Sequence, residues 1–124
     1  MEIKVHLDKE IAVKGQEEEI KIIYFTGKAY GKYFNGEVIC TGADTQKIKK
    51  DDSINLSARY ILEGTDYKGN NCRIFIENNG QDLKHCIPYL VTDSKALSKL
   101  EKDKLCSKVI GIDDGVLVSI YREK

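Results

Sequence analysis

Apolar and polar residues alternate along much of the chain with the period of two that half-buried β-strands have. The alternation is clearest at residues 53–62, SINLSARYIL. One face of that stretch would carry Ile54, Leu56, Ala58, Tyr60 and Leu62. Shorter stretches of the same kind, separated by charged or glycine-containing turns, precede and follow it. The pattern predicts a succession of antiparallel strands.

Residues 27–60 are the centre of this pattern. Four glycines separate the short apolar segments of this region: Gly27, Gly31, Gly36 and Gly42. A glycine within strand-like sequence marks a bulge, a bend or the close approach of another backbone. We therefore predict strands that fold back on one another, with a turn at the Gly-Ala-Asp sequence of residues 42–44.

The amino-terminal part of the chain predicts three short strands. Residues 3–7, IKVHL, alternate between apolar and polar and form the first strand. After a charged break, Ile11 and Val13 indicate a second strand. Residues 20–25, IKIIYF, are apolar on both faces, so both sides of the third strand are expected to be covered.

Two hairpins can be given a register from their own residues. In residues 54–78 the two apolar faces must point the same way, since a slip of one residue would turn one of them outward. The predicted pairs are Tyr60 with Ile76, Leu62 with Ile74, Ile61 with Phe75 and Arg59 with Glu77, joined by the loop Tyr67–Gly69. For the last hairpin, a three-residue loop at 113–115 with glycine in third place predicts a second register. Its pairs are Ile110 with Val118 and Ile112 with Val116.

Only residues 93–104 show a helical pattern. Asp93 can cap the amino terminus of this helix, and Leu97 and Leu100 are spaced for one narrow apolar face. We predict one short helix that serves as a lid or a crossover. Pro88 cannot lie inside a central strand, so the loop before the helix is expected to begin near it.

The chain thus predicts one domain, residues 1–124, with about eight to ten short strands and one short helix. A sheet this long in so small a chain must close or fold over to protect its edges. The expected fold is all-β, an antiparallel up-and-down β-barrel. When it closes at about eight strands, such a barrel has an interior that side chains fill or that holds one small ligand.

The charge balance excludes several functions. Lys plus Arg and Asp plus Glu both number 20, so no basic surplus could neutralise nucleic-acid phosphates or bind an anionic membrane. The amino terminus, MEIKVHLDKE, is charged where a signal peptide is apolar, and no run approaches the ~20 apolar residues of a membrane span. We expect a cytoplasmic protein without a nucleic-acid or membrane partner. The sequence leaves an oligomer open.

The cysteines favour a reducing compartment. Cys40, Cys72, Cys86 and Cys106 are scattered and include no C-x-x-C pair. Each lies beside apolar residues, as buried thiols do, so we expect all of them to be reduced, with a disulfide as the second choice. His85 is adjacent to a cysteine but has no second ligand pair, and neighbouring strand residues point to opposite faces. No metal, nucleotide or flavin cofactor is indicated.

Four segments, in order and spacing, resemble a known family: GKAYGKYFNGEV, TGADTQ, LSARYIL and GNNCRIFIENNG. They resemble the bacterial and fungal family called domain of unknown function 3237, or uncharacterised protein family 0311. The resemblance covers a little under half of the chain, and the last two strands, VIGI and VLVSIYR, fit it more loosely. It implies an up-and-down barrel of the calycin-like or a similar small type, without an established activity. The family commonly has an aromatic residue at the position of Thr45 and an acidic one at that of Ser57, so chemistry that needs those side chains would be lost here.

Three functions are compatible with this architecture. The first is a barrel that binds a small organic ligand in its lumen or at its mouth. Its candidate lining is Tyr24, Tyr33, Asp44, Gln46, Arg59, Tyr60 and Glu77. The second is an enzyme that transfers protons on a small organic acid or aromatic metabolite, with Asp44 or Glu77 as the base and Arg59 or a tyrosine holding the oxyanion. The third is an interaction module with a filled barrel.

Each candidate also has a purely structural role open to it. The tyrosines can be core residues whose hydroxyls reach the rim of the barrel. Asp44 can bond its own backbone in the predicted turn, and Gln46 is singled out only by its place in the TGADTQ segment. Arg59 and Glu77 can form an exposed cross-strand ion pair. The sequence assigns no catalytic residue.

Overall fold

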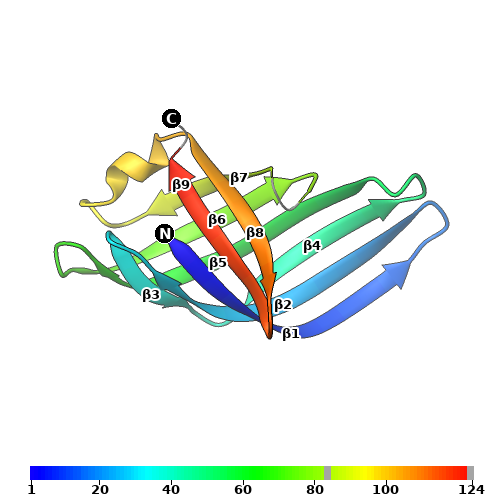
Figure 1. Ribbon diagram of the computed structural model, residues 1–124, viewed down its shortest axis with the longest axis horizontal. Coiled ribbons are helices and arrows are strands. Elements are labelled where there is room, and N and C mark those ends of the chain that lie inside the picture. The colour runs from blue at the N-terminus through cyan, green and yellow to red at the C-terminus, as the bar shows by residue number, and fades with distance from the viewer. Residues whose placement is uncertain (83–84, 123–124) are drawn as a thin grey trace.

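The chain forms an antiparallel sheet of nine strands that closes on itself, shown in Figure 1 as a computed structural model that describes residues 1–82 and 85–122. The strands are β1 (Glu2–Lys14), β2 (Glu18–Tyr30), β3 (Phe34–Val38), β4 (Gly42–Lys49), β5 (Ile54–Asp66), β6 (Asn71–Gly80), β7 (Cys86–Thr92), β8 (Leu105–Ile112) and β9 (Gly115–Arg122). Strand β1 pairs with β2 on one side and with β9 on the other, which closes the sheet into a barrel.

Strands β3 and β4 together fill one position of the barrel, between β2 and β5. Strand β3 pairs with one end of both neighbours, and β4 pairs with the other end. The nine strands therefore make a closed barrel of eight positions, in which each strand is antiparallel to its neighbours. The predicted antiparallel β-barrel is confirmed.

Alternation along each strand places its apolar face inside the barrel. The completely buried large apolar side chains are Ile3, Leu62, Ile74 and Ile76, from β1, β5 and β6. On β5 the face predicted to be buried does point inward, and Tyr60 and Leu56 are also buried there. Each large apolar side chain buried in this way contributes roughly 1.5–3 kcal/mol.

The β5–β6 hairpin has the register that the sequence predicts. Its pairs include Tyr60 with Ile76, Leu62 with Ile74, Ile61 with Phe75 and Arg59 with Glu77. The loop contains Gly69, whose φ of 85° is one that residues with a side chain rarely adopt. Asp66 stabilises the loop, because its Oδ1 accepts hydrogen bonds from the backbone N–H groups of Lys68 (2.9 Å) and Asn70 (3.1 Å).

Strand β1 is one long strand, which corrects the prediction of two short ones. A β-bulge between Leu7 and Glu10 takes up the charged residues at the predicted break, and pairing with β2 continues to Lys14. The β1–β2 hairpin therefore extends beyond the barrel, alongside the β4–β5 hairpin (Figure 1).

The predicted turn at residues 42–44 is wrong, because Gly42 begins β4. The chain turns at residues 39–41 instead, where Cys40 has a φ of 57°. Gly42 is required for packing, since a Cβ at this position would overlap the ring of Phe25 on β2. Asp44 consequently lies within strand β4 and not in a turn.

The segment between β7 and β8 contains a 3-10 turn, Ser98–Glu101, in place of the predicted helix. Asp93 is not a helix cap, because its Oδ1 accepts a hydrogen bond from the backbone N–H of Arg73 at 2.8 Å. The apolar contacts expected of the helix are still made: Leu97 is buried in the core, and Leu100 packs against it. No helix in the described part of the chain is long and apolar enough to cross a membrane.

Strand β7 contains Pro88, near which the loop before the helix was expected to begin. Pro88 lies opposite Asn78 of β6. Among the described residues, β7 pairs with β8 only through Cys86 and Ser107. The rest of β7 thus has a free edge toward β8, and a residue without an N–H group is tolerated at such an edge.

The β8–β9 hairpin differs from its predicted register by one residue. The observed pairs include Ile112 with Gly115 and Ile110 with Leu117. The turn therefore holds only residues 113 and 114, and Gly115 belongs to the strand. Glycine is needed at this strand position because β1 approaches closely: a Cβ at Gly115 would overlap the carbonyl oxygen of Val5.

The four cysteines are free thiols. Cys72 and Cys86 are buried, and desolvation raises the pKa of both thiols. Cys106 is half-buried, whereas Cys40 is exposed in the turn before β4, contrary to the expectation that all four are buried. The thiols therefore differ in how readily they should react.

We expect alkylation of the unfolded protein without a reductant to add four labels, measured by intact mass. On the folded protein Cys40 should react first, because the thiolate is the reactive species and burial disfavours it at Cys72 and Cys86. Peptide mapping of the partly labelled protein gives the order of reaction. A limit of two labels after unfolding would show a disulfide and contradict the reduced state.

Candidate functional site

The barrel interior holds a cavity of about 210 Å³ at the end from which the long hairpins project. Residues of β1, β2 and β4–β9 form its wall, and most of them are apolar. The apolar lining includes Val5, Leu7, Ile23, Phe25, Leu56 and Val118. Leu7 is 43% exposed, so it marks the mouth through which the cavity reaches solvent. A lumen of this size is what a barrel of about eight strands can enclose.

Strand register brings Asp44, Gln46 and Tyr60 to this cavity. Gly42 at the start of β4 faces the interior, and alternation directs Asp44 and Gln46 to the same side. Asp44 lies opposite Ala58 of β5, which faces inward together with its second neighbour, Tyr60. Three of the seven residues proposed from the sequence as ligand contacts therefore meet in one place.

The Asp44 carboxylate is held on one side only. The Nε2 amide of Gln46 donates a hydrogen bond to Asp44 Oδ2 at 3.1 Å. The other oxygen, Oδ1, is buried and has no hydrogen-bond partner among the described residues. Burial raises the pKa of Asp44, while the Gln46 amide and the nearby backbone of Ser57 offset part of that rise. A carboxylate oxygen buried without a donor is costly unless something supplies one.

Tyr60 is the second polar group without a partner in this cavity. Its side chain is 5% exposed, and its hydroxyl makes no hydrogen bond within the described residues. Burial raises the pKa of the hydroxyl well above its usual range, so the group stays neutral and can donate. Its ring packs edge-on against Phe25 at 5.4 Å between centroids, which fixes the direction of the hydroxyl.

A further polar pair, Asn78 with Ser107, borders the cavity, and the sequence analysis did not predict it. Asn78 and Ser107 are both buried. Asn78 Nδ2 donates to Ser107 Oγ at 2.8 Å, and Ser107 Oγ lies 3.0 Å from Asn78 Oδ1. Alternation along the strands could have predicted this pair, since Asn78 and Ser107 each occupy an inward position on an otherwise apolar face. Because the pair is mutually satisfied, its role is to connect β6 with β8.

The other four residues proposed from the sequence do not line this cavity. Arg59 and Glu77 are the predicted cross-strand pair, with Arg59 Nε 2.8 Å from Glu77 Oε2, but they lie on the outside of the barrel. The Arg59 side chain is 66% exposed, so the pair is an ordinary surface ion pair. Tyr24 is on the outer face of β2, because its neighbour Phe25 faces inward. Tyr33 is exposed at the opposite end of the barrel.

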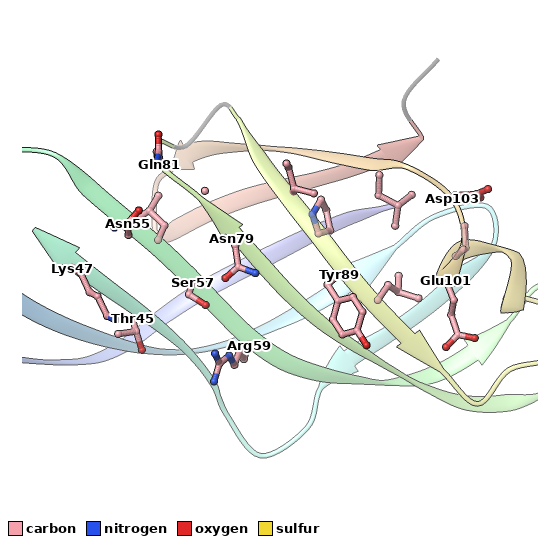
Figure 2. Close-up of a pocket in the computed structure, with 17 residues that line it drawn as sticks. Thr45, Lys47, Asn55, Ser57, Arg59, Asn79, Gln81, Tyr89, Glu101 and Asp103 are labelled. Carbon is pink, nitrogen blue, oxygen red and sulfur yellow. The ribbon is translucent and has the colours of Figure 1, made fainter.

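A larger hollow, of about 900 Å³, lies across the outer faces of β4–β6 and along the free edge of β7 (Figure 2). Figure 2 shows Ser57 and Asn79 in one part of this hollow and Glu101 and Asp103 beyond β7 in another. Lys47, Arg59, Glu101 and Asp103 contribute both signs of charge to its wall. In the described part of this wall, the buried hydroxyl of Ser57 lacks a partner. The mixed, open wall favours no ligand class, and the lumenal cavity is the better candidate site.

No cluster of three or more His, Cys, Asp or Glu side chains in the described part of the chain could hold a metal ion. The thiol of Cys86 lines the lumenal cavity. Desolvation raises the pKa of this thiol and opposes formation of a nucleophilic thiolate. The chemistry that the cavity offers is therefore hydrogen bonding and proton exchange at Asp44 and Tyr60.

These observations define an antiparallel β-barrel with a small, mostly apolar lumenal site. The sequence profile of the family called "Protein of unknown function (DUF3237)" matches residues 1–82. The chain belongs to this family, and the resemblance stated from the four sequence segments is confirmed. A UPF0311 protein of Clostridium acetobutylicum is 37% identical over 83 residues, which are 63% of this chain and 49% of that protein. The match thus spans about half the length of that relative.

Solved structures show the same fold over nearly the whole chain. A protein of unknown function from Clostridium acetobutylicum has a TM-score of 0.83 at 26% identity, covering 99% of this chain and 95% of that one. A β-barrel-like protein from Acinetobacter baumannii has a TM-score of 0.78 at 16% identity, covering 98% and 92%. The second likeness concerns the fold alone.

Proposed function

We propose that the protein binds a small organic ligand in the lumenal cavity, with Asp44, Gln46 and Tyr60 as its polar contacts. The observation that carries this proposal is a mostly apolar cavity whose wall holds two buried polar atoms without partners among the described residues, Asp44 Oδ1 and the Tyr60 hydroxyl oxygen. Ligand sites in proteins typically combine an apolar concave wall with a few convergent polar groups. A cytoplasmic location is part of the proposal and rests on the four free thiols.

The volume of the cavity sets the size of the proposed ligand. A cavity of about 150 Å³ with an apolar wall is known to accept benzene. At about 210 Å³ the lumenal cavity accommodates one substituted ring. Sites for drug-sized molecules are larger, ~300–1,000 Å³. Because the cavity is open beside Leu7, a substituent of the ring can extend into solvent.

Proton-transfer catalysis at the same site is a second candidate. Burial raises the pKa of Asp44, and a base is more effective when its pKa lies closer to the working pH. Glu77 and Arg59 are not part of this proposed catalytic site, since both lie on the outside of the barrel. Chemical change in a compound that binds would favour the enzyme over the binding protein. A filled-barrel interaction module is the least supported alternative, because it requires a packed lumen.

We expect benzyl alcohol, a neutral ring with one hydroxyl, to bind in the cavity with a dissociation constant on the order of 1 mM. The measurement is a titration followed by amide NMR, in which the shifted signals should belong to residues around the cavity. Ala58→Phe should abolish these shifts, because the new ring would occupy the space that the ligand needs.

The matched control is Ala43→Phe, the same substitution on the neighbouring strand. Ala43 lies opposite Arg59 on the outer face, so a ring there leaves the lumen unchanged. Well-dispersed amide spectra establish that both variants are folded. Wild-type shifts that are absent, or that scatter over the outer surface, would contradict the lumenal site whether or not Ala58→Phe folds.

A further inference from the structure

The lumenal cavity has an unbalanced set of ionisable groups. Among the residues that line it, Asp44, Tyr60 and Cys86 can ionise, and all three become anions when they do. Burial raises the pKa of Tyr60 and of Cys86, so these two groups stay neutral. None of the described residues that line the cavity is Lys, Arg or His. The charge that a bound molecule meets in the cavity is therefore that of the Asp44 carboxylate.

Lys21, a cation on the inner face of β2 beyond the cavity, is itself paired with a carboxylate. Lys21 lies opposite Gln46 on the inner face of the β1–β2 hairpin, one step beyond Asp44 along the sheet. Its Nζ is 3.5 Å from Glu10 Oε1, and Glu10 lies opposite Ile23 on the same inner face. The Lys21–Glu10 pair is neutral as a unit, so Lys21 brings no net positive charge to the inner face. A carboxylate that enters would meet Asp44 uncompensated.

The hydrogen-bonding groups of the site also favour a ligand that donates a hydrogen bond. Gln46 already uses its amide to donate to Asp44 Oδ2, and no described residue donates to Asp44 Oδ1. A ligand group that donates to this oxygen gains a charge-assisted hydrogen bond in a poorly solvated place. A ligand group that only accepts can use the Tyr60 hydroxyl but leaves Oδ1 unsatisfied.

We infer that the cavity selects a one-ring molecule bearing an ammonium group or another strong hydrogen-bond donor. It excludes the same ring bearing a carboxylate. This inference rests on the proposed function. The ring would occupy the apolar part of the wall, beside Phe25 and Val118, and the donor would contact Asp44. This class differs from the small organic acids considered from the sequence, because the described residues of the lining include no cation to receive an acid.

Three probes that share one ring test the inference: benzylamine, benzyl alcohol and benzoate, each titrated into the protein near neutral pH and followed by NMR. Wild-type protein should bind benzylamine most tightly and benzoate most weakly, with at least about a tenfold difference between them, as expected for one hydrogen bond to a charged group. Asp44→Asn should reduce that difference to about threefold or less, because the amide carries no charge.

Two comparisons make the result specific to Asp44. Asp44→Asn should be at least as stable as the wild type near neutral pH. Burial raises the pKa of Asp44 in the folded protein, so ionisation of Asp44 near neutral pH opposes folding. A loss of selectivity in Asp44→Asn is therefore not a consequence of unfolding. Asp51→Asn is the matched control. It removes the same charge at the exposed turn between β4 and β5, and it should keep the full preference for benzylamine.

The outcomes separate the inference from the proposal that it rests on. Failure of all three probes to bind overturns lumenal binding itself. Equal binding of benzylamine and benzoate, or an unchanged preference in Asp44→Asn, overturns only the selection for a donor and leaves lumenal binding in place. A tenfold preference that disappears in Asp44→Asn and persists in Asp51→Asn supports both.

Discussion

Gly115→Ala is expected to destabilise the folded protein by about 2–3 kcal/mol, which is a large part of the stability of a small domain. A Cβ at Gly115 would overlap the carbonyl oxygen of Val5. That oxygen belongs to the backbone of β1, so it cannot rotate away as a side chain could. Because the β1–β9 pairing closes the barrel, relief of the overlap must open this pairing. Urea unfolding followed by circular dichroism measures the loss.

Gly111→Ala is the matched control for this prediction. Gly111 lies in β8 of the same hairpin, opposite Val116, and no atom lies within 4 Å of an added Cβ. We expect this substitution to be neutral or to stabilise by about 0.4–1 kcal/mol, since alanine restricts the unfolded chain more than glycine does. Similar losses at both positions would mean that the approach of β9 to β1 is not what requires glycine.

The barrel could be predicted because alternation decides which face of each strand is buried. On β5 and β6 the two apolar faces must coincide, which excludes a slip of one residue and, together with the length of the loop, selects the pairs Tyr60 with Ile76 and Leu62 with Ile74. The loop residue Gly69 agrees with the same register through its local conformation. Both signals are contained within the hairpin, so no knowledge of the remaining chain was needed.

The errors concern contacts between segments that are distant in the sequence. Gly42 and Gly115 were interpreted as turn residues, yet each makes room for a neighbouring strand, at Phe25 and at Val5. A glycine is compatible with a turn and with a close approach of another strand, and the local sequence does not distinguish the two. The missing helix has a similar cause, since Leu97 reaches the core from a segment that contains only a 3-10 turn. Asp93 of this segment accepts a hydrogen bond from the backbone of Arg73 on β6, and Glu101 accepts one from the backbone of Thr92 on β7.

The candidate site was only partly accessible from the sequence. Arg59 and Tyr60 are adjacent on one strand and must face opposite sides, so alternation excludes that both line the lumen. Assigning the apolar face of β5 to the interior therefore already selects Tyr60. The position of Asp44 could not be obtained in this way, because it depends on where β4 begins, and this is set by the packing of Gly42 against Phe25.

Ser107→Ala is expected to cost about 1–3 kcal/mol, because it leaves both polar ends of the buried Asn78 side chain without their partner. The loss should be concentrated at one place in the barrel. Within the described residues, Ser107 and Cys86 make the one pairing between β7 and β8. Amide hydrogen exchange should therefore accelerate most in β7, and urea unfolding gives the total loss.

The double-mutant cycle with Asn78→Leu shows whether the two polar groups act as a pair. Removing both should cost less than the sum of the single losses by about 0.5–3 kcal/mol, since no buried polar group then lacks a partner. Ser119→Ala is the matched control on β9, where the hydroxyl makes only a long contact of 3.4 Å with Glu2, and its effect should stay within about 0.5 kcal/mol. Strict additivity of Ser107→Ala and Asn78→Leu would show that their hydrogen bonds do not hold β8 against the barrel. The contact of β8 with β6 and β7 would then depend on apolar packing alone.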